Sequence, residues 1–298
     1  FLLHATQNRN TSVRPVDEPV PRPPTKKTKI DADILVVEDN PVNQDVTIAM
    51  LKSLGARVEL VSNGLEAVRQ IAKQTYDVVL MDCQMPTMDG YEATKEIRQM
   101  ERDKGSRRVP IIAMTAHAMR GDREKCIAVG MDDYLSKPFD MTMLREILGR
   151  SVPSKYDEGD VETKVATRGA TAPPAALDET RTDAIDIEVL DNIRALQSPG
   201  EPDLLQQVVS NYLHDLPDLF SSLNNTLRDK DANALREISH KLKSSSANVG
   251  AHRLSKLCGH LENATKKEDF ESAGTILNAI DREYKLVTEY LSSEIDTG

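Results

Sequence analysis

Residues 77–90 read DVVLMDCQMPTMDG, and this stretch decides the fold. The run at 77–81 is short and apolar, which is typical of a buried strand, and an acidic residue, Asp82, ends it. A helical pattern, YEATKEIRQM, begins at Tyr91. A buried strand that leads through a short turn into an amphipathic helix is the repeating unit of parallel α/β sheets.

The same unit occurs on both sides of this stretch. Besides 77–81, the expected strands are 34–37 (ILVV), 57–61 (RVELV), 110–114 (PIIAM) and 134–136. Helical patterns follow each strand, and the last begins at about residue 140. Five strands that alternate with five helices predict a doubly wound, five-stranded parallel sheet of the flavodoxin type.

The rest of the chain follows a different pattern. Residues 184–298 carry apolar side chains at helical spacing in four long stretches, with a shorter helix expected near 186–196, which predicts an all-α four-helix bundle. Residues 1–31 and 151–183 are rich in proline and polar side chains and are expected to be linkers. The α/β domain would then span 32–150.

The composition narrows the functional classes. A net charge of −10 repels phosphate backbones, so direct binding of nucleic acid is not expected. Three widely spaced cysteines, Cys83, Cys126 and Cys258, argue for reduced thiols in the cytoplasm rather than a disulfide framework or zinc site. Cys83 follows Asp82, but without an evident resolving cysteine it is expected only to pack.

Polar side chains follow the carboxyl ends of the predicted strands. Glu38 and Asp39 end the first strand, Asp82 the third and Thr115 the fourth, while Lys137 follows the fifth. These ends meet at one crevice in such a sheet. Three adjacent carboxylates repel one another unless a cation lies among them, and Mg²⁺ suits such oxygen ligands. With an amine and a hydroxyl added, the set fits phosphoryl transfer.

Four motifs resemble the receiver domain of two-component response regulators over about residues 32–150. They are VVEDN (36–40), LMDCQMPTMDG (80–90), MTA (114–116) and YLSKPF (134–139). The resemblance implies that Asp82 accepts a phosphoryl group as an acyl phosphate. It also implies that Mg²⁺ is held by Glu38, Asp39, Asp82 and the backbone carbonyl of Gln84.

The same resemblance assigns the remaining polar residues. Thr115 and Lys137 would contact the phosphoryl oxygens, and the Lys137–Pro138 bond would be cis. Tyr134 would either follow Thr115 as an aromatic switch or simply pack at the sheet edge. Phosphatases of the haloacid-dehalogenase type also use an Asp nucleophile with Mg²⁺, but they need Asp-x-Asp after the first strand, where this chain has Glu-Asp.

A second candidate site lies at 236–250, REISHKLKSSSANVG. If Leu235, Ile238 and Leu242 form the buried stripe of this helix, His240 lies on the other side and is expected to face solvent. Lys243, three residues further on, would share that face. An exposed imidazole is an available nucleophile at neutral pH, and a nearby cation can stabilise arriving phosphate.

HKLKSSSANVG resembles the signature of histidine phosphotransfer (HPt) domains, which are four-helix bundles. The resemblance implies that His240 is a phospho-acceptor assisted by Lys243, and that Gly250 closes the segment. Many members carry Gly directly after the Lys, whereas this chain has Ser244.

A receiver followed by an HPt domain resembles the C-terminal part of a tripartite hybrid sensor histidine kinase. Phosphate would pass from an upstream kinase histidine to Asp82, then to His240, and finally to a separate response regulator. The kinase core is expected to precede Phe1 in a parent protein anchored in the inner membrane, and no autokinase activity is expected here. The open alternative is an interaction module that binds and restrains a partner enzyme when phosphorylated.

Overall fold

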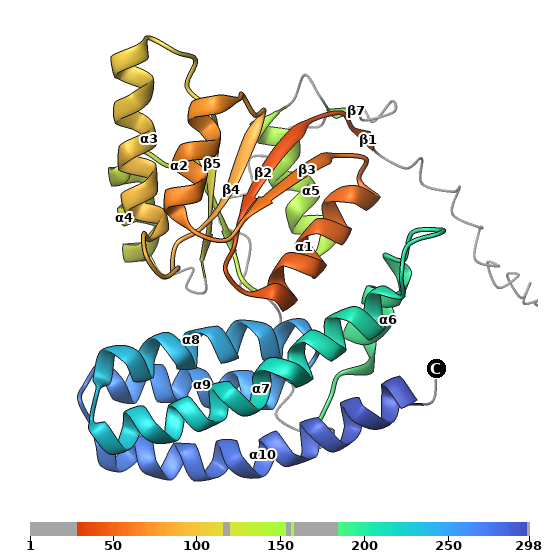
Figure 1. Cartoon of the computed structure of the whole chain (residues 1–298), viewed down its shortest axis with the longest axis vertical. Helices are drawn as coiled ribbons and strands as arrows, with labels where there is room; N and C mark the ends of the chain where they lie inside the picture. The colour runs from red at the N-terminus through yellow and green to blue at the C-terminus, as the bar shows by residue number, and fades with distance from the viewer. Residues whose placement is uncertain (1–28, 116–119, 153–155, 158–183, 297–298) are drawn as a thin grey trace, which may run out of the picture.

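The structure is a computed structural model that describes residues 29–115, 120–152, 156–157 and 184–296. An α/β domain lies against a helical bundle, with helix α1 of the first facing the bundle (Figure 1). Most of the two expected linkers fall outside the described residues. Within the described residues, no helix is both long and apolar enough to cross a bilayer.

The α/β domain contains the predicted parallel sheet. Its strands are β2 (Asp33–Val37), β3 (Arg57–Val61), β4 (Val78–Asp82), β5 (Ile111–Thr115) and β6 (Asp133–Ser136). They pair in parallel in the order β3-β2-β4-β5-β6. The helices between them are α1 (Pro41–Ser53), α2 (Gly64–Lys73), α3 (Gly90–Lys104), α4 (Arg120–Val129) and α5 (Met141–Ser151). The predicted doubly wound fold is confirmed.

Strand alternation divides the core of this domain into two apolar layers. Ile34 and Val36 point into the layer that includes Leu51 of α1. Leu35 and Val37 point into the opposite layer, beneath α2, α3 and α4. Because both faces are covered, the central strands β2, β4 and β5 are apolar between their ends, and their polar side chains appear only at those ends, whereas the edge strand β3 carries Glu59 in its middle.

The chain turns sharply from β2 into α1. The side-chain oxygen of Asn40 accepts hydrogen bonds from the backbone N–H of Val42 at 3.0 Å and of Asn43 at 3.4 Å. Pro41 takes the first helical position, where it needs no N–H partner. This cap fixes the two acidic residues before it, Glu38 and Asp39, at the carboxyl edge of the sheet.

The bundle contains the four predicted main helices and the shorter lead-in helix. They are α6 (Ile187–Ala195), α7 (Leu204–Asp229), α8 (Ala232–Asn248), α9 (His252–Thr265) and α10 (Phe270–Asp296). Gly250 links α8 to α9 with φ of 78°, and a Cβ there would lie 2.7 Å from the backbone oxygen of Asp186. Glycine therefore lets the turn pack against the residue that caps α6.

The linker prediction is wrong at two places. β1 (Lys29–Ile30) pairs antiparallel with β7 (Tyr156–Asp157), and both lie in stretches expected to be linkers. Ile30 is 1% exposed and belongs to the core beside α1 and α5. One apolar residue beside a lysine-rich stretch is too short a pattern to indicate a strand.

Candidate functional site

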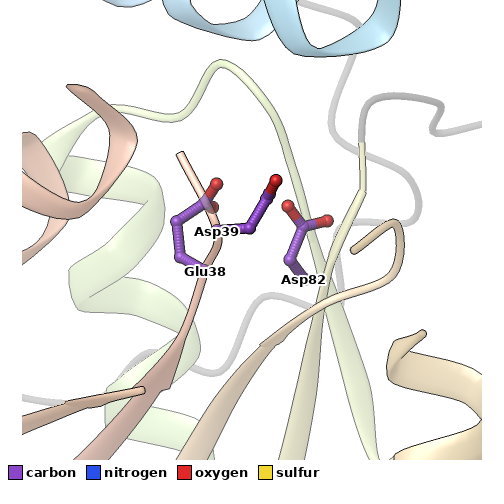
Figure 2. Close-up of side chains that lie close together, drawn as sticks. All are labelled: Glu38, Asp39 and Asp82. Atoms are coloured by element: carbon purple, nitrogen blue, oxygen red, sulfur yellow. The ribbon is translucent and has the colours of Figure 1, made fainter. Parts of the chain in front are cut away.

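Two neighbouring strands bring three carboxylates together. Glu38 and Asp39 follow β2, Asp82 ends β4, and these two strands are paired side by side. One carboxylate oxygen from each residue lies within 4.8 Å of the other two. Figure 2 shows the three side chains turned toward the space above the strand ends. Glu38 and Asp82 are buried, so their charges are poorly screened by water.

Lys137 provides a positive charge inside this acidic cluster. Its Nζ lies 2.6 Å from Asp82 Oδ2 and also donates to Glu38 Oε2. Burial alone lowers the pKa of Lys137, but the charges of Asp82 and Glu38 outweigh it and raise the pKa, so the amine stays protonated. Burial raises the pKa of Glu38, and the charge of Asp82 adds to that rise while Lys137 opposes it.

The other residues expected at this site lie around the cluster. Thr115 ends β5, the strand beside β4, and its backbone oxygen accepts a bond of 2.7 Å from the Lys137 N–H. The backbone N–H of Gln84 donates to Asp82 Oδ1 at 3.0 Å. The Lys137–Pro138 bond is cis, as expected. Tyr134 is half-buried, with the Arg123 guanidinium 5.9 Å from its ring centre.

Cys83 has a partner that the sequence did not indicate. Its Sγ lies 4.0 Å from Cys126 Sγ, so the expectation that a second cysteine is missing is wrong. Both side chains are buried in the layer beneath α3 and α4. Cys126 is far away in the sequence, and only the packing of α4 on the sheet brings it close.

His240 of α8 is held by a carboxylate from the next helix. His240 Nδ1 lies 2.9 Å from Glu262 Oε1, and Lys243 Nζ lies 2.7 Å from Glu262 Oε2. Burial raises the pKa of Glu262, but the bond from His240 and the charge of Lys243 outweigh it and lower the pKa to about 2. An ionised carboxylate only accepts hydrogen bonds, so Nδ1 carries a proton, and in the neutral imidazole the lone pair is then on Nε2.

The expectation that His240 faces solvent is wrong, because the residue is only 7% exposed. The core stripe of α8 is formed by Leu235, Ser239 and Leu242, while Ile238 is half-buried at the edge. Because serines occupy some of the buried positions, the buried stripe of α8 does not coincide with the pattern of its apolar residues. The side of α8 that carries His240 is covered by Glu262 of α9 and by the α/β domain.

Breaking the Glu262 contacts should cost stability in a pH-dependent way. Glu262→Gln is expected to reduce the free energy of unfolding by about 3 kcal/mol at pH 7, since the pKa of Glu262 falls from 4.5 to about 2 on folding. A lowered folded-state pKa stabilises the fold above pH 4.5, and this contribution disappears as the pH falls toward 2. Urea unfolding at several pH values measures the difference.

Glu271→Gln is the matched control for this prediction, because Glu271 is an exposed carboxylate in the first turn of α10. It should unfold like the unaltered protein at every pH. A destabilisation by Glu262→Gln that is equally large at pH 7 and near pH 3 would contradict the assigned ionic contacts.

The two candidate sites open onto one cavity between the domains. Its volume is about 640 Å³, and both Asp82 and His240 line it. The remaining lining residues are Glu38, Asp39, Asn40, Cys83, Gln84, Met85, Pro86, Asp89 and Tyr91 on one side, with Leu219, Asn233, Arg236, Glu237, Ile238, Lys241 and Ser244 on the other. Lys241 Nζ lies 3.8 Å from Asp39 Oδ2 across the boundary.

Ser244, at the position where glycine is usual, fits this arrangement. Its hydroxyl donates within α8 to the backbone oxygen of His240 at 3.3 Å, and it accepts from Asn43 of the α/β domain at 3.4 Å. The small hydroxyl therefore bonds to the facing domain and does not hold it away from α8.

Two family models match the chain. The response regulator receiver domain matches residues 34–149, and the Hpt domain matches residues 207–290. The chain carries a receiver domain and an Hpt domain. The α/β domain is the receiver, and the helical bundle contains the Hpt domain.

The curated relatives include histidine kinases that match the chain across both domains. The chain is 32% identical over 253 residues to the signal transduction histidine-protein kinase BarA of Escherichia coli, covering 84% of this chain and 26% of BarA. It is 32% identical over 237 residues to the sensor histidine kinase GacS of Pseudomonas protegens, covering 79% of this chain and 24% of GacS. The chain thus spans about a quarter of these relatives and matches their receiver and Hpt portion.

A solved receiver is also similar. The receiver domain of sensor histidine kinase PA1611 from Pseudomonas aeruginosa, solved with a magnesium ion in its active site cleft, is 55% identical. The match covers 41% of this chain and 98% of that one, with a TM-score of 0.38.

Proposed function

We propose that this receiver–Hpt pair carries a phosphoryl group from Asp82 to His240 within one chain, as the two middle stations of a phosphorelay. The observation that carries the proposal is the shared cavity, because the candidate acceptor of each domain lines the same space. Two groups held facing the same space react as if at very high local concentration.

In the first step Asp82 takes phosphate from a phosphohistidine of an upstream kinase core. A carboxylate oxygen of Asp82 attacks phosphorus, the P–N bond breaks, and a P–O bond forms. Lys137, bonded to Asp82 at 2.6 Å, is placed to stabilise the charge of the phosphoryl oxygens, and Thr115 is the proposed hydroxyl partner. The displaced histidine regains the electron pair of its ring nitrogen.

In the second step the imidazole of His240 takes the phosphoryl group. The lone pair of Nε2 attacks phosphorus, the P–O bond to Asp82 breaks, and the Asp82 carboxylate is restored. Glu262 holds the Nδ1 proton and offsets the positive charge that the ring acquires, since Nδ1 lies 2.9 Å from it. Lys243 keeps Glu262 ionised through the bond at 2.7 Å. His240 would then pass the group to the aspartate of a separate response regulator.

The carboxylate cluster fits a divalent cation. Three oxygen ligands from Glu38, Asp39 and Asp82 lie within 4.8 Å of one another, and such hard donors suit Mg²⁺. The backbone carbonyl of Gln84 is the proposed fourth protein ligand. When bound, the ion would neutralise charge on the phosphoryl oxygens.

The partners and the location follow from the proposed relay. The upstream kinase core would belong to the same parent protein, as in the hybrid kinase relatives, and the downstream partner would be the receiver of a response regulator. We place both domains on the cytoplasmic side of a parent protein anchored in the inner membrane. The three cysteines are buried thiols, which is consistent with a reducing compartment.

Removing divalent cations tests the role of the acidic cluster. After incubation with acetyl phosphate and Mg²⁺, mass spectrometry should find phosphate on the receiver and on the bundle. With excess EDTA, both labels should fall at least about tenfold, because the carboxylates then repel the incoming phosphate. Adding Mg²⁺ above the EDTA concentration should restore them. Equal labelling with and without EDTA would contradict the proposed site.

A further inference from the structure

Asn43, in the first turn of α1, lies between the acidic cluster and the bundle. Its side-chain Nδ2 donates to Glu38 Oε1 at 2.9 Å. Its Oδ1 accepts from Asn248 Nδ2 of α8 at 2.8 Å. Asn43 Nδ2 also donates to Ser244 Oγ of α8 at 3.4 Å, and Asn43 is only 2% exposed, so these contacts take the place of water around the amide. A continuous chain of hydrogen bonds therefore runs from α8 of the Hpt domain to a proposed ligand of the cation.

Each hydrogen bond in this chain has a defined donor and a defined acceptor. An amide presents an acceptor on one side and donors on the other. When Asn248 donates to the oxygen of Asn43, the NH₂ group of Asn43 must face Glu38. Without the bundle, the oxygen of Asn43 loses this donor, and its side chain is free to rotate away from Glu38. Docking of the bundle therefore selects the orientation that supports the Glu38 carboxylate.

Groups that hold a metal ligand in place affect metal affinity strongly, with losses of about 10- to 100-fold when they are removed. We propose that Asn43 couples docking of the Hpt domain to cation binding by the receiver, so that the docked receiver binds Mg²⁺ more tightly than the free one. This inference rests on the proposed Mg²⁺ site. By linkage, bound Mg²⁺ must strengthen docking by the same factor.

The consequence for the relay is an ordered cycle. A receiver loaded with Mg²⁺, as phosphoryl transfer requires, holds its Hpt domain most firmly. Loss of the ion weakens docking of the Hpt domain on the receiver, and α8 then becomes accessible to another receiver. Asn43 and Asn248 act as positioning residues, because both work through Glu38.

A second set of interdomain bonds provides the matched control. Gln207 Nε2 and Asn211 Nδ2 of α7 each donate to the Asp45 carboxylate at 2.7 Å. These bonds end at Asp45, two residues along α1 from Asn43, and Asp45 is not among the three clustered carboxylates. Gln207→Ala thus removes one interdomain amide bond, as Asn248→Ala does, without touching the bond chain to Glu38.

The test is calorimetric titration of the full chain with Mg²⁺. Asn248→Ala should weaken Mg²⁺ binding about tenfold, whereas Gln207→Ala should stay within about twofold of the unaltered chain. Asn248→Asp is the sharper variant. It keeps a contact across the boundary but offers an acceptor, which turns the Asn43 oxygen toward Glu38, so Mg²⁺ binding should weaken. The added negative charge alone would strengthen it.

Two results would overturn the coupling: equal Mg²⁺ affinities for Asn248→Ala and Gln207→Ala, or tighter Mg²⁺ binding by Asn248→Asp. Labelling of the unaltered chain with acetyl phosphate at saturating Mg²⁺ separates this failure from failure of the proposed function. If Asp82 and His240 carry phosphate while the affinities do not differ, only the coupling is wrong. If neither carries phosphate, the relay itself is wrong.

Discussion

Asp82→Asn should abolish phosphate on both domains after incubation with acetyl phosphate and Mg²⁺. The amide lacks the nucleophilic carboxylate oxygen, so no acyl phosphate can form, and His240 then has no donor within the chain. The effect on both sites should be complete at the sensitivity of intact-protein mass spectrometry. The fold should persist, because the Asn side chain has nearly the same volume and can still accept the bond from the Gln84 N–H, which is 3.0 Å long.

Asp140→Asn is the control for this variant. Asp140 caps α5 by accepting from the Met143 N–H at 2.8 Å, and Asn serves equally well at such a position. The same change of Asp to Asn should therefore leave both labels intact. Phosphate on His240 in the Asp82→Asn chain would show that acetyl phosphate reaches the histidine directly, and the proposed order of transfer would be wrong.

His240→Gln should separate phosphorylation of Asp82 from transfer to the bundle. Phosphate should still appear on Asp82 and should accumulate to a higher level, because transfer to the bundle no longer removes it. The bundle should carry none, and transfer to a separate receiver should stop. Gln retains N–H donors that can bond to Glu262, so the variant should keep the packing of α8 against α9.

His260→Gln is the matched control, since His260 is an exposed histidine on α9. It should leave both labels unchanged. Phosphate on the bundle of the His240→Gln chain would point to another acceptor. If the parent protein kept its full output without phosphate on His240, the alternative of a phosphorylation-switched module that restrains a partner enzyme would be favoured.

The receiver fold was predictable because two rules apply to it: strands covered on both faces are apolar, and polar residues follow their ends. The central strands β2, β4 and β5 are apolar between their ends, as strands covered on both faces must be. Polar residues then mark the strand ends, so the positions of Glu38, Asp39 and Asp82 followed from the topology alone. Lys137 fits the same rule, and the structure places its amine between two of these carboxylates.

The environment of His240 was not predictable by the same reasoning. Helical spacing assumes that apolar residues mark the buried face, but Ser239 and Ser246 lie in the core of α8. Ser246 is accommodated by a bond of 2.9 Å to the Tyr212 hydroxyl, and Ser239 bonds to the backbone oxygen of Leu235. The burial of His240 also depends on the receiver, which no pattern within α8 can indicate.

Glu262 and Asn43 were missed for a related reason. Glu262 follows Leu261 in the apolar stripe of α9, so its only local signal is a carboxylate beside a buried face. Asn43 lies three residues after the cap of α1 and looks like an ordinary helix residue. Their roles come from contacts with residues 22 and 205 positions away, which only the folded chain defines.

The central claim is transfer from Asp82 to His240 within one chain, and the concentration dependence of that transfer tests it most directly. The receiver is labelled with acetyl phosphate, the donor is removed, and the appearance of phosphate on His240 is followed at chain concentrations that differ about a hundredfold. The account predicts one first-order rate at all concentrations, and much slower transfer in a dilute mixture of Asp82→Asn and His240→Gln chains. A rate that rises in proportion to concentration, matched by that mixture, would show that phosphate passes between chains and would contradict the account.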